Sequence, residues 1–241
     1  MLDIEKELGD AVRHFWRVRG SQQENQGSTT GQKDAGSRAA VTGGKHGDGF
    51  IGLMAAVLRE AGLNNTQIYI RQKTLPCFFR PAKDWDLIVK VGDDLIAVIE
   101  VKAHVGSFGN NFNNRVEEAL GSATDFWAAY REATFQPSAR PWLGYLMMLE
   151  EAPGSTRASS PKKLPFYPMR KEFQGISYAQ RYMIFCERLV RERLYDATCF
   201  LMSSAREGIE GKYSEPSTEL SFKNFAASLS GRAAAFAKTK L

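Results

Sequence analysis

Cysteine is scarce in this sequence. Three cysteines stand among 241 residues, Cys77, Cys186 and Cys199, and no two of them form a Cys-x-x-Cys pair. This excludes a dense disulfide framework and favours a reducing compartment. The sequence also lacks an apolar run long enough to cross a membrane, and its first residues are polar and partly acidic, unlike a secretory signal. We therefore expect a cytoplasmic protein.

Histidine is equally rare, and an excess of acidic residues is absent. The three histidines, His14, His46 and His104, are too far apart in sequence to form a recognisable metal-binding motif, and no Ser-His-Asp or Cys-His arrangement is legible. Lys and Arg number 32 against 27 Asp and Glu, which gives a net charge of +5 and a sequence pI near 9.1. That balance suits a polyanionic partner. On charge alone, a merely basic soluble protein stays open as an alternative.

The hydrophobic pattern predicts a single α/β domain over residues 1–241. Hydrophobic residues make up 43% of the chain, enough for a large core. Helical periodicity is found at residues 4–16, 50–60, 115–133, 178–192 and 220–237. Strand-like segments are found at residues 67–71, 85–91, 95–101, 142–149 and 198–202. This order favours a central mixed β-sheet flanked by helices. Between the first two helices, a segment at about 20–49 is rich in Gly, Ser and Gln, and we expect a long loop or arm there.

The stretch from Asp84 to Lys102 carries the most chemistry. Two apolar strands joined by a tight turn at residues 92–94 read as a β-hairpin. Asp86 begins the first strand and Glu100 stands near the end of the second, so antiparallel pairing would bring the two carboxylates together. Lys102 follows Glu100 by two residues and leaves the same face of the strand.

Such a group can hold Mg²⁺ beside a water molecule. Mg²⁺ prefers oxygen ligands and can polarise a phosphodiester and activate water. We expect Asp86, Glu100 and the carbonyl of Val101 as metal ligands, and Asp86, Glu100 and Lys102 as the catalytic residues. Lys102 would orient the attacking water, or act as a base if burial lowers its pKa. Alternatively, the acids and the lysine form a solvated salt bridge. Asp84 is a second candidate for the role of Asp86.

These residues carry a resemblance to a known family. Asp86 with Glu100-Val101-Lys102 resembles the PD-(D/E)xK nuclease motif, and the run from His104 to Ala119, HVGSFGNNFNNRVEEA, resembles type II restriction endonucleases of the XhoI family. Similar stretches at residues 41–44, 79–81, 141–145 and 175–182 extend the resemblance over nearly the whole chain. Two details depart from the family pattern: Ala103 stands where Ser is usual, and the usual Pro in the Val-Gly-Ser loop is absent.

The resemblance implies a PD-(D/E)xK restriction endonuclease-like fold and a bacterial, cytoplasmic enzyme. It implies Mg²⁺-dependent cleavage of double-stranded DNA at the palindrome CTCGAG, leaving four-base 5′ overhangs. It also implies a homodimer, because a two-fold site is most simply read by a two-fold protein. A companion DNA methyltransferase would protect the same site in the host.

Residues that could contact DNA surround the motif. A Gly/Asn-rich segment at residues 106–114 reads as a loop whose amides, with the following Arg, could read base edges. The candidates there are Asn110, Asn111, Asn113, Asn114 and Arg115. Phosphate contacts are expected from Arg80, Lys83, His104 and Lys45, and from Lys33 and Arg38 once DNA orders the arm. Asn also favours turns and helix caps, and basic residues are often simply solvated.

Other acids and other functions stay open. Asp48 or Glu60 could add a carboxylate to the metal site, and Glu117 or Glu118 could pair with Arg115 or Lys102.

Besides a sequence-specific endonuclease, the motif fits a nuclease of repair or recombination that selects DNA structure. A DNA-binding module without activity is the third reading, against which the intact Asp86, Glu100 and Lys102 speak.

Overall fold

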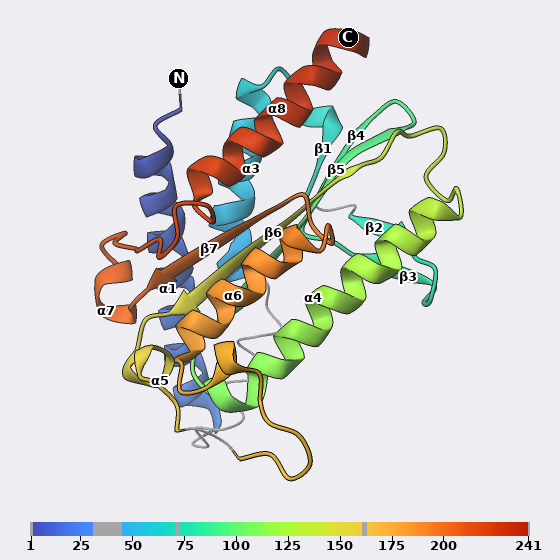
Figure 1. Cartoon of the computed structure of the whole chain (residues 1–241). Helices are drawn as coiled ribbons and strands as arrows, with labels where there is room; N and C mark the ends of the chain where they lie inside the picture. Colours follow the sequence, from blue (N-terminus) through green and yellow to red (C-terminus); the bar gives the residue numbers. More distant parts are fainter. Residues whose placement is uncertain (1, 31–44, 71–72, 161–162, 241) are drawn as a thin grey trace.

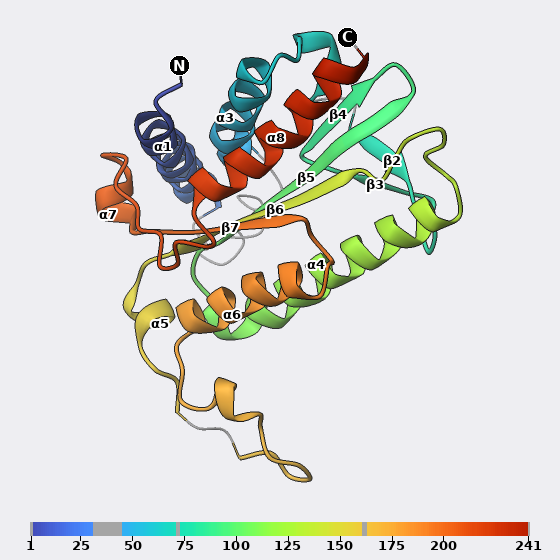
Figure 2. The same cartoon turned by 45° about the horizontal axis from the view of Figure 1, so that its top comes forward.

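The computed structural model describes residues 2–30, 45–70, 73–160 and 163–240. A five-stranded sheet lies between two layers of helices (Figures 1 and 2). Helices α1 (Ile4–Thr30), α3 (Asp48–Glu60) and α8 (Phe222–Lys240) cover one face. Helices α4 (Phe108–Arg131) and α6 (Tyr178–Arg191) cover the other. The expected α/β class with a central mixed sheet is confirmed.

The sheet has the strand order β1-β4-β5-β6-β7. Its strands are β1 (Ile68–Tyr69), β4 (Leu87–Val91), β5 (Asp94–His104), β6 (Trp142–Glu150) and β7 (Ala197–Ser203). β4 pairs antiparallel with β1 and β5, whereas β5, β6 and β7 run parallel. The parallel strands are buried on both faces, which explains their nearly continuous apolar sequences. The pairing of β4 with β5 ends at Leu87 and Ile99, so the residues of β5 after Ile99 have no residue of β4 beside them.

Two apolar cores hold the layers together. One packs α1, α3 and α8 on the sheet, with Phe15, Phe50 and Phe225 among its fully buried side chains. The other lies beneath α4 and α6 and includes Trp85 and Tyr182. Trp85, Trp127 and Trp142 are all buried. No helix in these described ranges is long and apolar enough to cross a membrane.

The predicted loop at 20–49 is wrong at both of its ends. Helix α1 continues to Thr30, and a short 3-10 helix, η1 (Lys45–Gly47), leads directly into α3. Propagating a helix costs little once it is nucleated, and the residues after Gly20 include the good helix formers Gln22, Gln23 and Glu24. Residues 31–44, with Lys33 and Arg38, lie outside the described part of the chain.

The predicted loop at 106–114 is also wrong, because α4 begins at Phe108. Gly106 and Ser107 have positive φ angles of 68° and 46° and turn the chain sharply from β5 into the helix. Phe108, Phe112 and Val116 then recur every fourth residue and pack against the core beneath α4. The asparagines fall between these apolar positions, within the first two turns of the helix.

A small hairpin reaches across the start of β4. Its strands are β2 (Thr74–Pro76) and β3 (Ala82–Asp84). Asp125 of α4 fixes the hairpin: its Oδ1 accepts hydrogen bonds from the backbone N–H groups of Phe78 and Phe79, each at 2.8 Å. The remaining short elements are η2 (Asn65–Gln67), α5 (Pro153–Thr156), η3 (Lys171–Phe173) and α7 (Ala205–Gly208).

Candidate active site

The two predicted carboxylates meet where β4 begins and β5 runs on. Asp86 precedes Leu87, which pairs with Ile99, and the Asp86 backbone N–H donates to the Ile99 carbonyl at 3.1 Å. The side chain of Asp86 accepts a hydrogen bond from the Val101 N–H at 2.7 Å. Asp86 is therefore fixed beside the Glu100–Val101 peptide, as the hairpin pattern predicts. Asp84 accepts a hydrogen bond from Thr74 across the small hairpin instead.

Lysines surround both carboxylates. Glu100 is 3% exposed. One of its oxygens accepts a hydrogen bond from Lys102, and the other lies 3.0 Å from Nζ of Lys83. Nζ of Lys73 lies 3.5 Å from Oδ1 of Asp86. Three ammonium groups thus stand against two acids, and β3 brings Lys83 to the carboxylate rather than to the outer surface.

Burial and neighbouring charges shift the pKa values of Asp86 and Lys102. Burial raises the pKa of Asp86, and the neighbouring charge of Glu100 raises it further, against the Val101 N–H, Lys102 and Lys73. For Lys102, burial acts to lower the pKa, but attraction to Glu100 and the hydrogen bond between them prevail, so the pKa is raised. Lys102 is therefore a charged ammonium, which favours the role of orienting water over that of a base.

The donor set suits a hard cation. Asp86, Glu100 and the Val101 peptide offer oxygen atoms, and Mg²⁺ is commonly held by one or two carboxylates with water and phosphate. Within the described residues, no group of three or more His, Cys, Asp or Glu side chains forms a larger metal-binding cluster. The ammonium of Lys83 on Glu100 shows that positive charge is already accommodated at this carboxylate. The residues present fit Mg²⁺.

A groove of about 810 Å³ opens beside Glu100 and Lys102. Of the residues expected to contact DNA, Arg80, Lys83 and Arg115 line it. Nε of Arg80 is 2.7 Å from Oδ2 of Asp125, so this guanidinium also anchors the small hairpin. Glu117 and Glu118 lie on the same wall, and Glu118 pairs with Arg115 at 2.5 Å. The groove therefore joins the catalytic candidates to basic side chains.

A smaller hollow of about 200 Å³ lies against Asp86 and Lys102. We call it the basic hollow. Asn111, Arg115 and His104 line it, together with Arg19 of α1 and His46 of η1. His104 is 3% exposed, and its Nδ1 lies 2.6 Å from the Tyr182 hydroxyl. Burial lowers the pKa of His104 to about 4, assisted by the charges of Arg115 and Arg19. Burial and Arg19 likewise lower the pKa of His46.

Other sequence candidates lie outside these two hollows. Asn110, Asn113 and Asn114 are exposed on the first turns of α4. Lys45 begins η1, and its side chain is not among those described. Asp48 is the exposed first residue of α3. Glu60 accepts a hydrogen bond from the backbone N–H of Leu2.

Sequence reasoning missed Arg19, His46 and Lys73. Arg19 follows Phe15 by four residues, so a helix continued past Trp16 would have placed both on the buried face. His46 and Lys73 are brought to the site by η1 and by the segment before β2, whose positions depend on tertiary packing. No sequence signal identifies these two.

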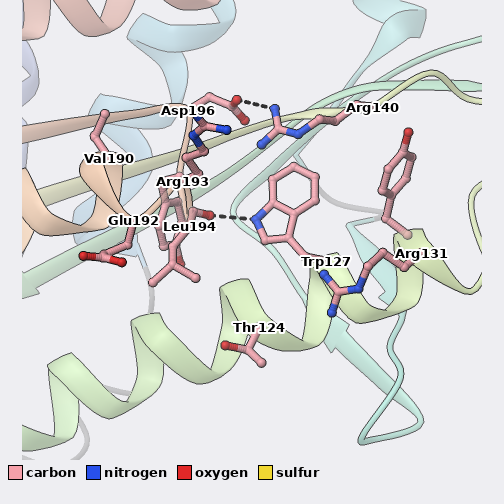
Figure 3. A pocket seen from close by; sticks show the side chains of 11 residues that line it. Thr124, Trp127, Arg131, Arg140, Val190, Glu192, Arg193, Leu194 and Asp196 are labelled. Atoms are coloured by element: carbon pink, nitrogen blue, oxygen red, sulfur yellow. Dashed lines mark hydrogen bonds and ion pairs between the residues drawn. The ribbon is translucent and has the colours of Figure 1, made fainter.

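A third hollow, of about 800 Å³, lies at the opposite end of the parallel strands (Figure 3). Several of its polar groups bond to one another. Nε1 of Trp127 donates to the Leu194 carbonyl at 2.8 Å, and Arg140 pairs with Asp196 while stacking 4.1 Å from the Trp127 ring centre. None of the predicted catalytic residues lines it. These contacts tie α4 to the turn before β7.

Comparisons with known proteins agree on one family. Residues 25–215 match the family model described as restriction endonuclease XhoI. The type II restriction enzyme BstVI of Geobacillus stearothermophilus is 48% identical over 206 residues, 82% of this chain and 91% of the relative. The type II restriction enzyme XhoI of Xanthomonas vasicola is 39% identical over 183 residues, 74% of this chain and 72% of the relative.

A third relative, the type II restriction enzyme AbrI of Azospirillum brasilense, is 42% identical over 160 residues. That alignment covers 65% of this chain and 71% of the relative. No solved structure gives a significant match.

Proposed function

The chain belongs to the XhoI family of restriction endonucleases, and on that premise we propose that it cuts double-stranded DNA at CTCGAG with Mg²⁺ as cofactor. As a type II restriction endonuclease it is a site-specific deoxyribonuclease that binds double-stranded DNA. The recognition sequence, the four-base 5′ overhangs and the choice of metal are the proposed part. They rest on the family resemblance of the motif and on the oxygen donors at the sheet edge.

One observation carries the assignment of the site. Asp86 is locked against the Val101 N–H, so its carboxylate stands beside Glu100 with Lys102 on the same strand. We assign Asp86, Glu100 and the Val101 carbonyl as the groups that would hold Mg²⁺. Bound there, Mg²⁺ supplies charge neutralisation for the phosphate and a more acidic water.

The chain's own residues perform the remaining tasks. The raised pKa of Lys102 keeps its ammonium charged, so it can orient the attacking water and balance the developing negative charge on the phosphate. Lys83 and Lys102 share Glu100 in the free protein. A cation at this carboxylate competes with them. Lys83 has a flexible side chain, so its ammonium can then turn toward the groove and a DNA phosphate.

The family also suggests the setting in which the enzyme works. A homodimer follows from the two-fold symmetry of the proposed site. We propose that a companion methyltransferase modifies the same sequence, and that both act in the bacterial cytoplasm. We also propose that residues 1–241 form one domain.

Mapping the cut ends tests the proposal. Phage DNA is incubated with the protein and Mg²⁺, and the fragment ends are sequenced. We expect discrete fragments that end within CTCGAG with four-base 5′ overhangs. Ends at another fixed sequence would overturn the proposed specificity, and cutting of branched or flapped DNA alone would favour a structure-selective nuclease.

A further inference from the structure

The basic hollow beside Asp86 contains an unusual number of buried polar atoms without partners. Among the described residues, six buried side-chain nitrogens have no hydrogen-bond partner. Four of them belong to residues that line this hollow: Nε of Arg19, Nδ1 of His46, Nε2 of His104 and Nε of Arg115. Buried polar groups are nearly always satisfied, so such a concentration points to a missing ligand. The two guanidinium nitrogens can only donate, so that ligand must offer hydrogen-bond acceptors.

The four groups come from four separate elements of the fold. Arg19 belongs to α1, His46 to η1, His104 to the end of β5 and Arg115 to α4. Arg19 is 8% exposed and His104 is 3% exposed, so water reaches neither freely. Helices from both faces of the sheet therefore converge at the edge that β4 leaves open.

The charge in the hollow calls for an anion. Arg19, Arg115 and Lys102 bring three cations, against the single carboxylate of Asp86 on the wall. Three of these charges have acidic neighbours that do not line the hollow: Glu100 pairs with Lys102, Glu118 pairs with Arg115, and Glu150 attracts Arg19. Asp48 attracts His46. A buried guanidinium offers only donors, and its fork matches the oxygens of a phosphate.

Size restricts the ligand to a single group. The hollow, at about 200 Å³, is smaller than the pockets that usually enclose a whole small molecule. A nucleobase pair does not fit, whereas a phosphate does. The third hollow (Figure 3) is a useful contrast: it is larger and lined by Arg131, Arg140 and Arg193, yet within the described ranges none of its residues has a buried polar atom without a partner.

We propose that Arg19, His46, His104 and Arg115 form a pocket for one DNA backbone phosphate, at or beside the bond to be cut. This inference rests on the proposed function. Because Lys102 and Asp86 line the same hollow, a phosphate seated here fixes the strand relative to the catalytic edge. Arg19 and His46 thereby bind DNA from the face of the sheet opposite α4.

A scan with neutral phosphates tests this pocket. Duplexes carry the mapped recognition site, with one methylphosphonate placed at each position around the cut in turn. Binding is measured without added metal, for the wild type and for Arg19→Gln. We expect one position at which the methylphosphonate weakens wild-type binding roughly 10- to 100-fold and has little effect on the variant. Equal losses for both proteins at every position would overturn the inference.

Salt dependence gives an independent readout. We expect Arg19→Gln to reduce the slope of log K against log salt by about one, the amount for one phosphate contact. Arg17→Gln is the matched control, because Arg17 is exposed on the same helix and the charge change is identical. An unchanged slope in the Arg19 variant would also overturn the inference.

Two further variants guard against misfolding. Arg19→Lys keeps the charge but not the fork, so it should retain the slope while binding more weakly. Arg115 has a side chain that is 20% exposed. In Arg115→Gln, the methylphosphonate that has little effect on Arg19→Gln should also have little effect. If the two variants become insensitive at different positions, they do not share one phosphate. If the wild type fails to cut any DNA, the proposed function itself fails, whereas normal cutting with an unchanged phosphate response rejects only this pocket.

Discussion

Replacing Glu100 by Gln should both stop cleavage and destabilise the fold. The carboxylate side chain is 4% exposed and lies 3.0 Å from Nζ of Lys83, with Lys102 at its other oxygen. At an effective dielectric of about 20, a pair at that distance gains roughly 5 kcal/mol of Coulomb attraction. Desolvation offsets most of this gain. The substitution keeps the shape of the side chain and removes only its charge.

The expected loss of stability is about 2 kcal/mol. Breaking a fully buried pair costs about 3–5 kcal/mol, but the lysines are 12% and 27% exposed and can turn partly toward water. For a domain of this size, about 2 kcal/mol lowers Tm by roughly 4–8 °C. Cleavage should fall at least about 10³-fold, because losing a ligand to the cation removes several kcal/mol of transition-state stabilisation.

Thermal unfolding and single-turnover cleavage measure the two effects on the same preparation. Glu219→Gln, an exposed acid with the same charge change, should leave both Tm and the rate unchanged. The reasoning would be refuted by a Glu100→Gln variant that melts within about 2 °C of the wild type and cuts DNA at a comparable rate.

Three further outcomes follow from the same contacts. Lys83→Gln removes a competitor for Glu100, so the Mg²⁺ concentration for half-maximal cleavage should fall several-fold; a higher requirement would contradict the competition. Lys102→Met should lose most of the cleavage rate while still binding DNA, and normal turnover would reject its role. Because burial lowers the pKa of His104 to about 4, below the unfolded value of about 6.5, the unfolded state binds more protons between these values. Stability should therefore be complete above pH 6.5 and fall by up to about 3 kcal/mol toward pH 4, and Tm measured in His104→Asn should lose that part of the pH dependence.

The sheet and its carboxylates could be predicted because local sequence determines them. The apolar strands on either side of the Gly92 turn establish the hairpin, and the two-residue alternation places Glu100 and Lys102 on one face. The hairpin register then puts Asp86 beside Val101, and in the structure the Val101 N–H donates a hydrogen bond to the Asp86 side chain. The extent of β5 was underestimated, since its last residues, up to His104, are polar or small.

The surroundings of the site could not be predicted because they depend on packing between distant segments. Lys83 meets Glu100 only because Asp125 fixes the small hairpin against α4. Arg19 enters the basic hollow only because α1 continues past the residues that looked like a loop. In both cases, composition favoured a solvated basic residue, and tertiary contacts decided otherwise.

The central claim is that Asp86 and Glu100 cut DNA with the help of a divalent cation. Its most direct test is to compare cleavage and DNA binding of Asp86→Ala with the wild type over a range of Mg²⁺ concentrations. The account predicts that the variant binds its site but leaves the duplex intact at every concentration. Metal-dependent cutting that persists in this variant would contradict it.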